Sequence, residues 1–185
     1  MDKTYADTVR LLLAVAPDVF ANDIFAMKGG TAINLFVRDM PRLSVDIDVV
    51  YLPWQTPRDE ALQAINQELA AIATRVAPLG VQTRLVRAKD LGDTKLIVEN
   101  DASQVKIEVN VVFRGSVLPV ERRPLSAKTS DLFGVEFELP VLAPDELYAS
   151  KLVAALDRQH PRDLFDVWQL FESGDISDGM VECFV

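Results

Sequence analysis

The sequence predicts an α+β fold, in which helices flank a mixed β-sheet and a helical segment follows at the C-terminus. The chain has 185 residues, of which 49% are hydrophobic and 25% charged, which suits a globular domain with its own core. The spacing of apolar residues alternates between the periods of a helix and of a strand. The predicted order is helix, strand, helix, strand, helix, three or four strands, then helices, which indicates a mixed sheet with helices on one face.

Helices and strands alternate in the first half of the chain. Pro53 ends one predicted strand, and Pro57 stands in the first turn of the long helix that follows. From the hydrophobic spacing we expect helices over 4–16, 31–38 and 56–77, and strands over 25–28 and 45–52.

Strands dominate the next part of the chain, and two helices follow them. We expect strands over 81–87, 95–99, 104–113 and 135–141, and helices over 143–157 and 161–172. A boundary near 140–144 divides the chain into a core over 1–142 and a C-terminal helical segment over 143–185. Because the last residues are apolar, where native termini are usually polar, we expect this segment to begin a larger helical region.

Composition limits the classes of function. The formal net charge is −9, which argues against a general basic surface that binds nucleic acid. It does not exclude a nucleic-acid substrate that is bound locally. Basic residues do cluster locally, for example at Arg84, Arg87 and Lys89, although a solvated surface is the simpler interpretation. Cys183 is the single cysteine, so a reducing, cytoplasmic setting is expected. His160 is the single histidine, which argues against a histidine-rich zinc site.

Two aspartates on one predicted strand form the centre of the candidate site. Asp46 and Asp48 alternate with apolar residues, so both carboxylates point to the same side of the strand. Two close carboxylates repel each other unless a cation neutralises them, and Mg²⁺ prefers hard oxygen ligands. Glu108 lies on the polar face of a later strand, and it can complete a carboxylate triad if the two strands are neighbours.

A glycine pair precedes the aspartates. The turn Lys28-Gly29-Gly30-Thr31 separates a predicted strand from a helix, where free N–H groups and the helix dipole favour phosphate. Alone, a glycine pair is usually only a tight turn, and Asp-x-Asp is common on surfaces. Asp46 follows Gly30 by sixteen residues, and this order of strand, glycine pair, helix and aspartate pair indicates a metal- and phosphate-binding centre.

These motifs resemble those of the nucleotidyltransferase superfamily, which has a Gly-Gly or Gly-Ser turn followed by Asp-x-Asp. More narrowly, the sequence is similar to the AbiEii/AbiGii family, toxins of type IV abortive-infection toxin–antitoxin systems. The matching segments are Lys28–Ala32, Arg42–Asp48, Glu146–Leu152 and Arg162–Asp166. The last two segments set this family apart from other nucleotidyltransferases.

The resemblance implies a nucleotidyltransferase-like sheet and a Mg²⁺-dependent enzyme that transfers a nucleotide from an NTP to an acceptor. In related toxins the acceptor is thought to be tRNA, and a cognate antitoxin accompanies the toxin. The implied metal ligands are Asp46, Asp48 and Glu108, and Lys151 joins them as a catalytic residue that neutralises the triphosphate. The implied nucleotide-binding residues are Lys28, Gly29, Gly30, Thr31, Arg42, Ser44, Arg162, Asp163 and Asp166.

Other interpretations stay open. Asp166 follows Arg162 by four residues, so an ion pair within one helix explains that motif without a ligand. The chain could also be a non-catalytic module that binds NTP or regulates a partner, or a nucleotidyltransferase that modifies a small molecule or a protein. The apolar run at 11–16 is too short to span a bilayer, so no membrane partner is expected.

Overall fold

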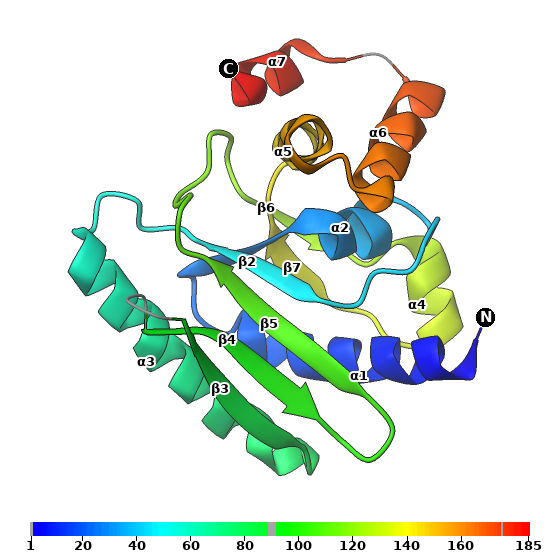
Figure 1. Ribbon diagram of the computed structural model, residues 1–185. Coiled ribbons are helices and arrows are strands. Elements are labelled where there is room, and N and C mark those ends of the chain that lie inside the picture. The colour runs from blue at the N-terminus through cyan, green and yellow to red at the C-terminus, as the bar shows by residue number, and fades with distance from the viewer. Residues whose placement is uncertain (1, 89–91, 175) are drawn as a thin grey trace.

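The computed structural model describes residues 2–88, 92–174 and 176–185, so Lys89 lies outside the described part. Seven strands form one mixed sheet in the order β3-β4-β5-β2-β1-β7-β6 (Figure 1). The strands are β1 (Phe25–Lys28), β2 (Ile47–Tyr51), β3 (Gln82–Ala88), β4 (Gly92–Glu99), β5 (Gln104–Asn110), β6 (Glu121–Pro124) and β7 (Glu138–Val141). The predicted α+β class with a mixed sheet is confirmed, but the prediction that helices lie on one face was wrong, because helices lie on both faces of the sheet (Figure 1).

Helices cover the sheet, and the chain ends in a group of three helices. They are α1 (Lys3–Val19), α2 (Gly29–Ala32) with the π-helical turn η1 (Ile33–Val37), α3 (Arg58–Val76) with the short turn η2 (Ala77–Leu79), α4 (Ala127–Phe133), α5 (Pro144–Arg158), α6 (Pro161–Ser173) and α7 (Asp178–Phe184). The last three pack together, since α5 contacts both α6 and α7.

One face of the sheet carries the hydrophobic core. Ile47 and Val49 of β2 and Ile107 of β5 are almost completely buried on this face. The helices α1 and α3 lie together against it and contribute side chains such as Leu12 and Leu69 (Figure 1). Strand residues alternate between the two faces, so the polar residues of β2 and β5 point to the opposite side.

The central strands place that polar face beside α5. In the register, β1 runs antiparallel to β2, while β2 runs parallel to β5. The short helix α2 starts directly at the end of β1 and contacts both β2 and α5. The glycine turn and the aspartate strand are therefore neighbours in space, on the side of the sheet away from α1 and α3.

Several predicted boundaries were wrong, each for a local reason. The first helix continues past Pro17 to Val19. Pro17 removes one backbone hydrogen bond of the helix, but the continued helix buries Val19 completely. The strand predicted to reach Phe113 ends at Asn110, because the Asn110 side chain accepts hydrogen bonds from the N–H groups of Val112 and Phe113 and turns the chain.

Three elements were not predicted. The edge strand β6 consists of charged residues and proline, Glu121–Pro124, so its sequence lacks an apolar alternation. The helix α4 begins at Ser126, whose hydroxyl accepts from the N–H of Thr129, within a segment predicted as a polar connection. Ser177 caps α7 in the same way.

Candidate active site

A row of four charged side chains crosses the polar face of the sheet. The register pairs Lys28 of β1 with Asp48 of β2, and Asp48 with Glu108 of β5. It also pairs Glu108 with Lys95 of β4, and the two side chains form an ion pair at 2.8 Å between Nζ and Oε1. Residues paired in register share a face, so two carboxylates lie side by side with a lysine at each end of the row.

The two glycines allow a close approach that no other residue permits. Gly29 has a φ of 78°, and a Cβ atom there would collide with Oδ2 of Asp48. A Cβ atom at Gly30 would collide with the Arg42 guanidinium and come within 3.1 Å of Oγ of Ser44. The glycine turn therefore brings the backbone N–H groups at the start of α2 directly against the aspartate.

Thr31 and Ser44 support the glycine turn on its buried side. Their hydroxyl oxygens lie 2.9 Å apart and share a hydrogen bond, and Thr31 is buried. This bond ties the beginning of α2 to the segment that leads into β2. Since each hydroxyl already has a partner, the structure gives these residues a supporting position in the apo protein.

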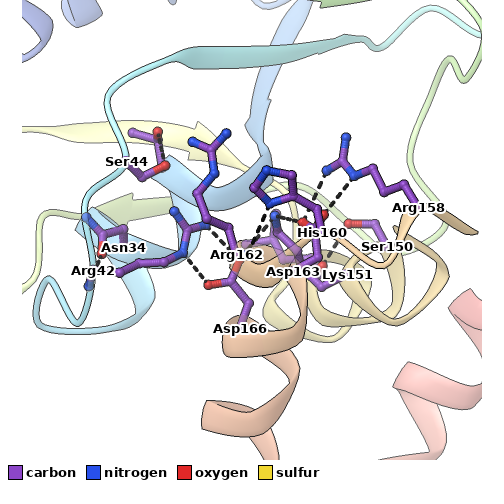
Figure 2. Close-up of polar contacts among 12 residues, drawn as sticks. Asn34, Arg42, Ser44, Ser150, Lys151, Arg158, His160, Arg162, Asp163 and Asp166 are labelled. Carbon is purple, nitrogen blue, oxygen red and sulfur yellow. Dashed lines mark hydrogen bonds and ion pairs between the residues drawn. The ribbon is translucent and has the colours of Figure 1, made fainter. Parts of the chain in front are cut away.

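Two buried aspartates of α6 form ion pairs with three basic side chains (Figure 2). Arg42 donates to both oxygens of Asp166, from Nε at 2.6 Å and from Nη2 at 2.7 Å. Lys151 of α5 contacts Asp163 at 2.9 Å and Asp166 at 3.1 Å. Arg158 donates from Nε to Asp163 at 2.7 Å. Exposed fractions of 2% for Asp163 and 3% for Asp166 mean that water screens their pairs with Lys151 and Arg42 weakly, whereas the Arg158 side chain is 62% exposed.

These contacts change the expectation for the Arg162–Asp166 motif. Asp166 pairs with Arg42 and Lys151 rather than within its own helix, while Arg162 is exposed and its guanidinium points away from Asp166 (Figure 2). The buried carboxylates of Asp163 and Asp166 face cations, and a negative charge there would repel a triphosphate. Their contacts favour a role in holding Lys151 and Arg42, so direct nucleotide binding by either residue stays a prediction.

A pocket of about 830 Å³ lies between the polar face of the sheet and α5. Lys28, Gly29, Asp48, Glu108 and Lys151 all line it. Eight other predicted site residues lie outside the lining, namely Gly30, Thr31, Arg42, Ser44, Asp46, Arg162, Asp163 and Asp166. The pocket thus combines a glycine turn, two carboxylates and two lysines, while the remaining predicted residues surround or support it.

Burial makes both Asp48 and Lys28 costly to charge in this pocket. Burial, with the nearby charges of Asp46 and Glu108, raises the pKa of Asp48 to about 6, although Lys151 and Lys28 oppose the increase. Burial also lowers the pKa of Lys28, an effect that Lys151 reinforces and Asp48 and Glu146 oppose. A carboxylate that is costly to ionise becomes favourable once a cation binds beside it.

The donor set fits Mg²⁺ with help from a substrate. Among the described residues, no group of three His, Cys, Asp or Glu side chains is arranged to hold a metal ion. Three close carboxylates without a cation would repel one another, and Glu108 is drawn toward Lys95 instead. Mg²⁺ commonly uses one or two carboxylates and takes its other ligands from phosphate and water, which Asp48 with Glu108 or Asp46 can satisfy.

Arg158 and Glu146 are among the pocket residues that the sequence did not predict. Arg158 follows Lys151 by seven residues, which places both on one face of α5, and this spacing could have revealed it. Glu146 accepts hydrogen bonds from the N–H groups of Val117 and Leu118, so it fixes the loop opposite α5. Recognising that contact requires the three-dimensional arrangement.

Comparison with known families identifies the family of the chain. The sequence model described as "Nucleotidyl transferase AbiEii toxin, Type IV TA system" matches residues 10–185. The chain belongs to the AbiEii nucleotidyltransferase toxin family. The match covers the glycine turn, the aspartate strand and the α5–α6 segment, and it confirms the resemblance seen in the sequence. A search of curated proteins gives no match.

Solved structures share the AbiEii-type fold. MenT4, a nucleotidyltransferase toxin from Mycobacterium tuberculosis H37Rv, matches with a TM-score of 0.65 and 22% identity, over 97% of this chain and 63% of MenT4. The chain thus spans somewhat less than two thirds of the length of MenT4. The antibiotic-resistance factor ANT(2'')-Ia matches with a TM-score of 0.50 and 15% identity, over 99% of this chain and 91% of that protein. In the described part of the AbiEii-family chain, no helix has both the length and the apolar character needed to cross a bilayer.

Proposed function

We propose that the protein is a Mg²⁺-dependent nucleotidyltransferase toxin that transfers a nucleotide from an NTP to an acceptor, with tRNA as that acceptor. The observation that carries this proposal is the contact between Gly29 and Asp48, in a pocket that Lys28 and Lys151 also line. A turn that can bind phosphate, placed directly against a carboxylate that can bind a metal ion, suits nucleotidyl transfer from an NTP. Family membership supports the same chemistry.

The triphosphate would bind at the glycine end of the pocket. Backbone N–H groups at the start of α2 can donate to phosphate oxygens, and Lys28 and Lys151 add positive charge. Arg158 lines the same pocket while Asp163 holds its guanidinium. Arg42, Ser44 and Thr31 fit a second layer that supports the turn, because they contact it without lining the pocket. Nucleotide binding by the exposed Arg162 stays a prediction.

The carboxylates would bind the metal and position the reacting groups. Asp48 and Glu108, with Asp46 nearby, supply hard oxygen ligands, and Mg²⁺ when bound would neutralise charge on the carboxylates and phosphates. The acceptor oxygen then attacks the α-phosphorus in line, a new phosphate ester bond forms, and pyrophosphate leaves. Glu108 lies beside Asp48 and lines the pocket, where it can orient the acceptor hydroxyl.

Family membership supports a proposal for the biological setting. We propose that the protein acts in the cytoplasm, that a cognate antitoxin binds it, and that it serves abortive infection. Residues 1–142 would form the nucleotidyltransferase core and 143–185 the helical segment that supplies Lys151 and Arg158. This division places the pocket between the two parts, which suits a site where helices close over a sheet.

An expression assay tests the toxin proposal. Growth should stop when the wild-type chain is produced in bacteria, and the double variant Asp46→Asn/Asp48→Asn should remove this arrest. Isothermal calorimetry with each NTP and Mg²⁺ should show binding that the double variant weakens strongly. Equal toxicity of the double variant, at equal protein level, would contradict the mechanism.

A small-molecule acceptor is the second candidate. A pocket of about 830 Å³ falls in the size range of small-molecule sites, and ANT(2'')-Ia shares the fold. This candidate predicts that labelled nucleotide appears in a low-molecular-mass product when cell extract is filtered before the reaction. Label found in the RNA fraction instead would favour the first proposal.

A further inference from the structure

Two exposed aromatic rings stand at the rim of the pocket. Trp54 follows β2 and Phe113 follows β5, and their exposed fractions are 62% and 68%. Both line the pocket that also contains Lys28 and Lys151. Large apolar side chains exposed together at the mouth of a pocket usually mark a binding surface.

The two loops that carry the rings contact each other. A Cβ atom on Gly115 would lie 2.8 Å from Cβ of Trp54, and the Gly115 N–H donates to the Tyr51 carbonyl at 2.7 Å. Arg114 donates from Nη1 to the Thr56 carbonyl at 2.7 Å. The loops after β2 and β5 therefore form one unit, which lowers the entropy cost of presenting the rings to a ligand.

The chemistry of this rim favours stacking. Its other apolar members, Val112, Val117 and Val153, are also exposed. The N–H groups of Val112 and Val117 already donate to Asn110 and Glu146. Flat aromatic faces with few free polar groups suit the face of a nucleobase and tolerate any base, since every base has a π-face.

The position of the rim favours the acceptor over the donor. Strands β2 and β5 run in parallel from Asp48 and Glu108 toward the loops that carry Trp54 and Phe113, whereas Gly29 lies at the other end, beside Asp48. A triphosphate on the glycine turn leaves the rim for the second substrate. Rings that are about two-thirds exposed also suit a polymer end that stays largely outside the pocket.

The neighbouring sheet surface adds positive charge. Arg84 of β3, Ile97 of β4 and Lys106 of β5 form a row next to the one that contains Glu108, and on the same face. Arg84 and Lys106 are exposed, and Lys95 stands in the adjacent row. In β5, Lys106 precedes Glu108 and Phe113 follows the strand, so this basic row lies on the side of the carboxylates away from the rim. In a chain of net charge −9, it offers a local positive charge that attracts nucleic acid toward the carboxylates.

We propose that Trp54 and Phe113 form a stacking platform for the nucleobases at the end of a single-stranded nucleic-acid acceptor. The inference rests on the proposed function, and it names the surface that would recognise the acceptor. The terminal hydroxyl would reach Glu108 and Asp48.

Tryptophan fluorescence tests the platform directly. The chain has two tryptophans, and Trp168→Phe leaves Trp54 as the sole emitter. In this background, a ten-nucleotide oligoadenylate should quench the emission to saturation, since a base stacks on the indole. Each NTP with Mg²⁺, added alone, should leave the emission nearly unchanged. Absence of quenching by the oligonucleotide, or equal quenching by an NTP alone, would overturn the proposal.

Binding measurements on variants provide the matched comparison. Phe113→Ala and Trp54→Ala should each raise the Kd for the oligoadenylate about tenfold, and at least fivefold, the range that one base–aromatic stack supplies. Trp54→Phe should restore most of the affinity. Phe171→Ala removes another exposed ring, which lies outside this pocket, and should leave the Kd unchanged. An equal effect of Phe171→Ala, or no effect of Phe113→Ala, would contradict the platform.

A third comparison separates this inference from the proposed function. Asp48→Asn should abolish nucleotide transfer and leave oligoadenylate binding intact. If the wild-type enzyme transfers nucleotides but its KM for the RNA acceptor does not rise in Phe113→Ala, the platform is wrong and the transferase stands. If oligoadenylate binds at the rim but no transfer to any acceptor occurs, the proposed function fails and the nucleic-acid surface stands.

Discussion

Gly29 lies so close to Asp48 that any side chain on residue 29 would collide with the Asp48 carboxylate. This contact joins the end of β1 to β2, and it brings helix N–H groups beside the acid that is expected to bind metal. The central part of the account depends on this contact, so the first prediction concerns it.

Gly29→Ala should lower NTP binding at least tenfold and weaken transfer, because the new methyl group must push Asp48 or the turn aside. The control is Gly80→Ala, which has a similar φ of 72° but open space around its Cβ position. Both variants should lose stability by about 1–2 kcal/mol from the left-handed backbone. Calorimetric NTP titration checks the prediction, and equal binding by the two variants would refute it.

The raised pKa of Asp48 predicts a pH dependence. Because its pKa is about 6 in the folded protein, kcat/KM for NTP at low Mg²⁺ should rise between pH 5 and pH 7 and then level off. Higher Mg²⁺ should shift this rise to lower pH, since the cation favours the ionised acid. A flat profile from pH 5 to pH 8 would show that Asp48 ionisation does not limit the reaction.

The same group predicts a change in stability. A folded-state pKa above the ordinary value of 3.8 means that the folded protein holds the proton more tightly, so stability falls as the pH rises from about 4 to about 6. Asp48→Asn should therefore stabilise the apo protein at pH 8, by roughly 2–3 kcal/mol, and give little gain at pH 4. Thermal melts at the two pH values, without Mg²⁺, measure the difference. A destabilised variant at pH 8 would contradict the assignment.

The Arg42–Asp166 ion pair, which lies next to Lys151 and the glycine turn, predicts a stability effect. Asp166→Asn removes the charge that faces both Arg42 and Lys151, and should cost about 3–5 kcal/mol because two cations lose a buried partner. The control Arg10→Ala removes an exposed ion pair with Asp7 and should cost about 0–1 kcal/mol. Urea unfolding gives both values, and similar costs would show that the buried network adds little.

Lys151 can be tested without dismantling that network. In Lys151→Met, Asp166 keeps its two contacts with Arg42 and Asp163 keeps those with Arg158, so the variant should fold. Loss of a cation beside the triphosphate should lower kcat/KM about 10²- to 10³-fold. Lys128→Ala, on α4 away from the pocket, should match the wild type. A Lys151→Met variant that folds and retains full activity would remove this residue from the site.

Regular patterns in the sequence made much of the centre predictable. Strand alternation around Asp48 and Glu108 anticipated that both would lie opposite the core, and the register places them side by side. The glycine pair anticipated a close approach to a ligand, although the nearest neighbours proved to be Asp48 and Arg42. Local periodicity is a reliable guide when strand residues alternate between core and polar face.

Long-range partners could not be predicted in the same way. Arg42 and Asp166 are separated by 124 residues, and nothing in either motif names the other as its partner. The helix spacing suggested an Arg162–Asp166 pair, but burial of Asp166 against two other cations prevailed. The edge strand β6 was missed because its pairing with β7, rather than its own charged sequence, makes it a strand.

The central claim is tested most directly by a labelled-nucleotide transfer assay. The wild-type protein is incubated with Mg²⁺, total cellular RNA and each of the four NTPs labelled at the α-phosphate, and the RNA is then separated by electrophoresis. We predict labelled RNA with at least one NTP, no label without Mg²⁺, and none with a folded Asp48→Asn variant. Label that persists in Asp48→Asn, or a folded wild-type protein that labels no RNA with any NTP, would contradict the account.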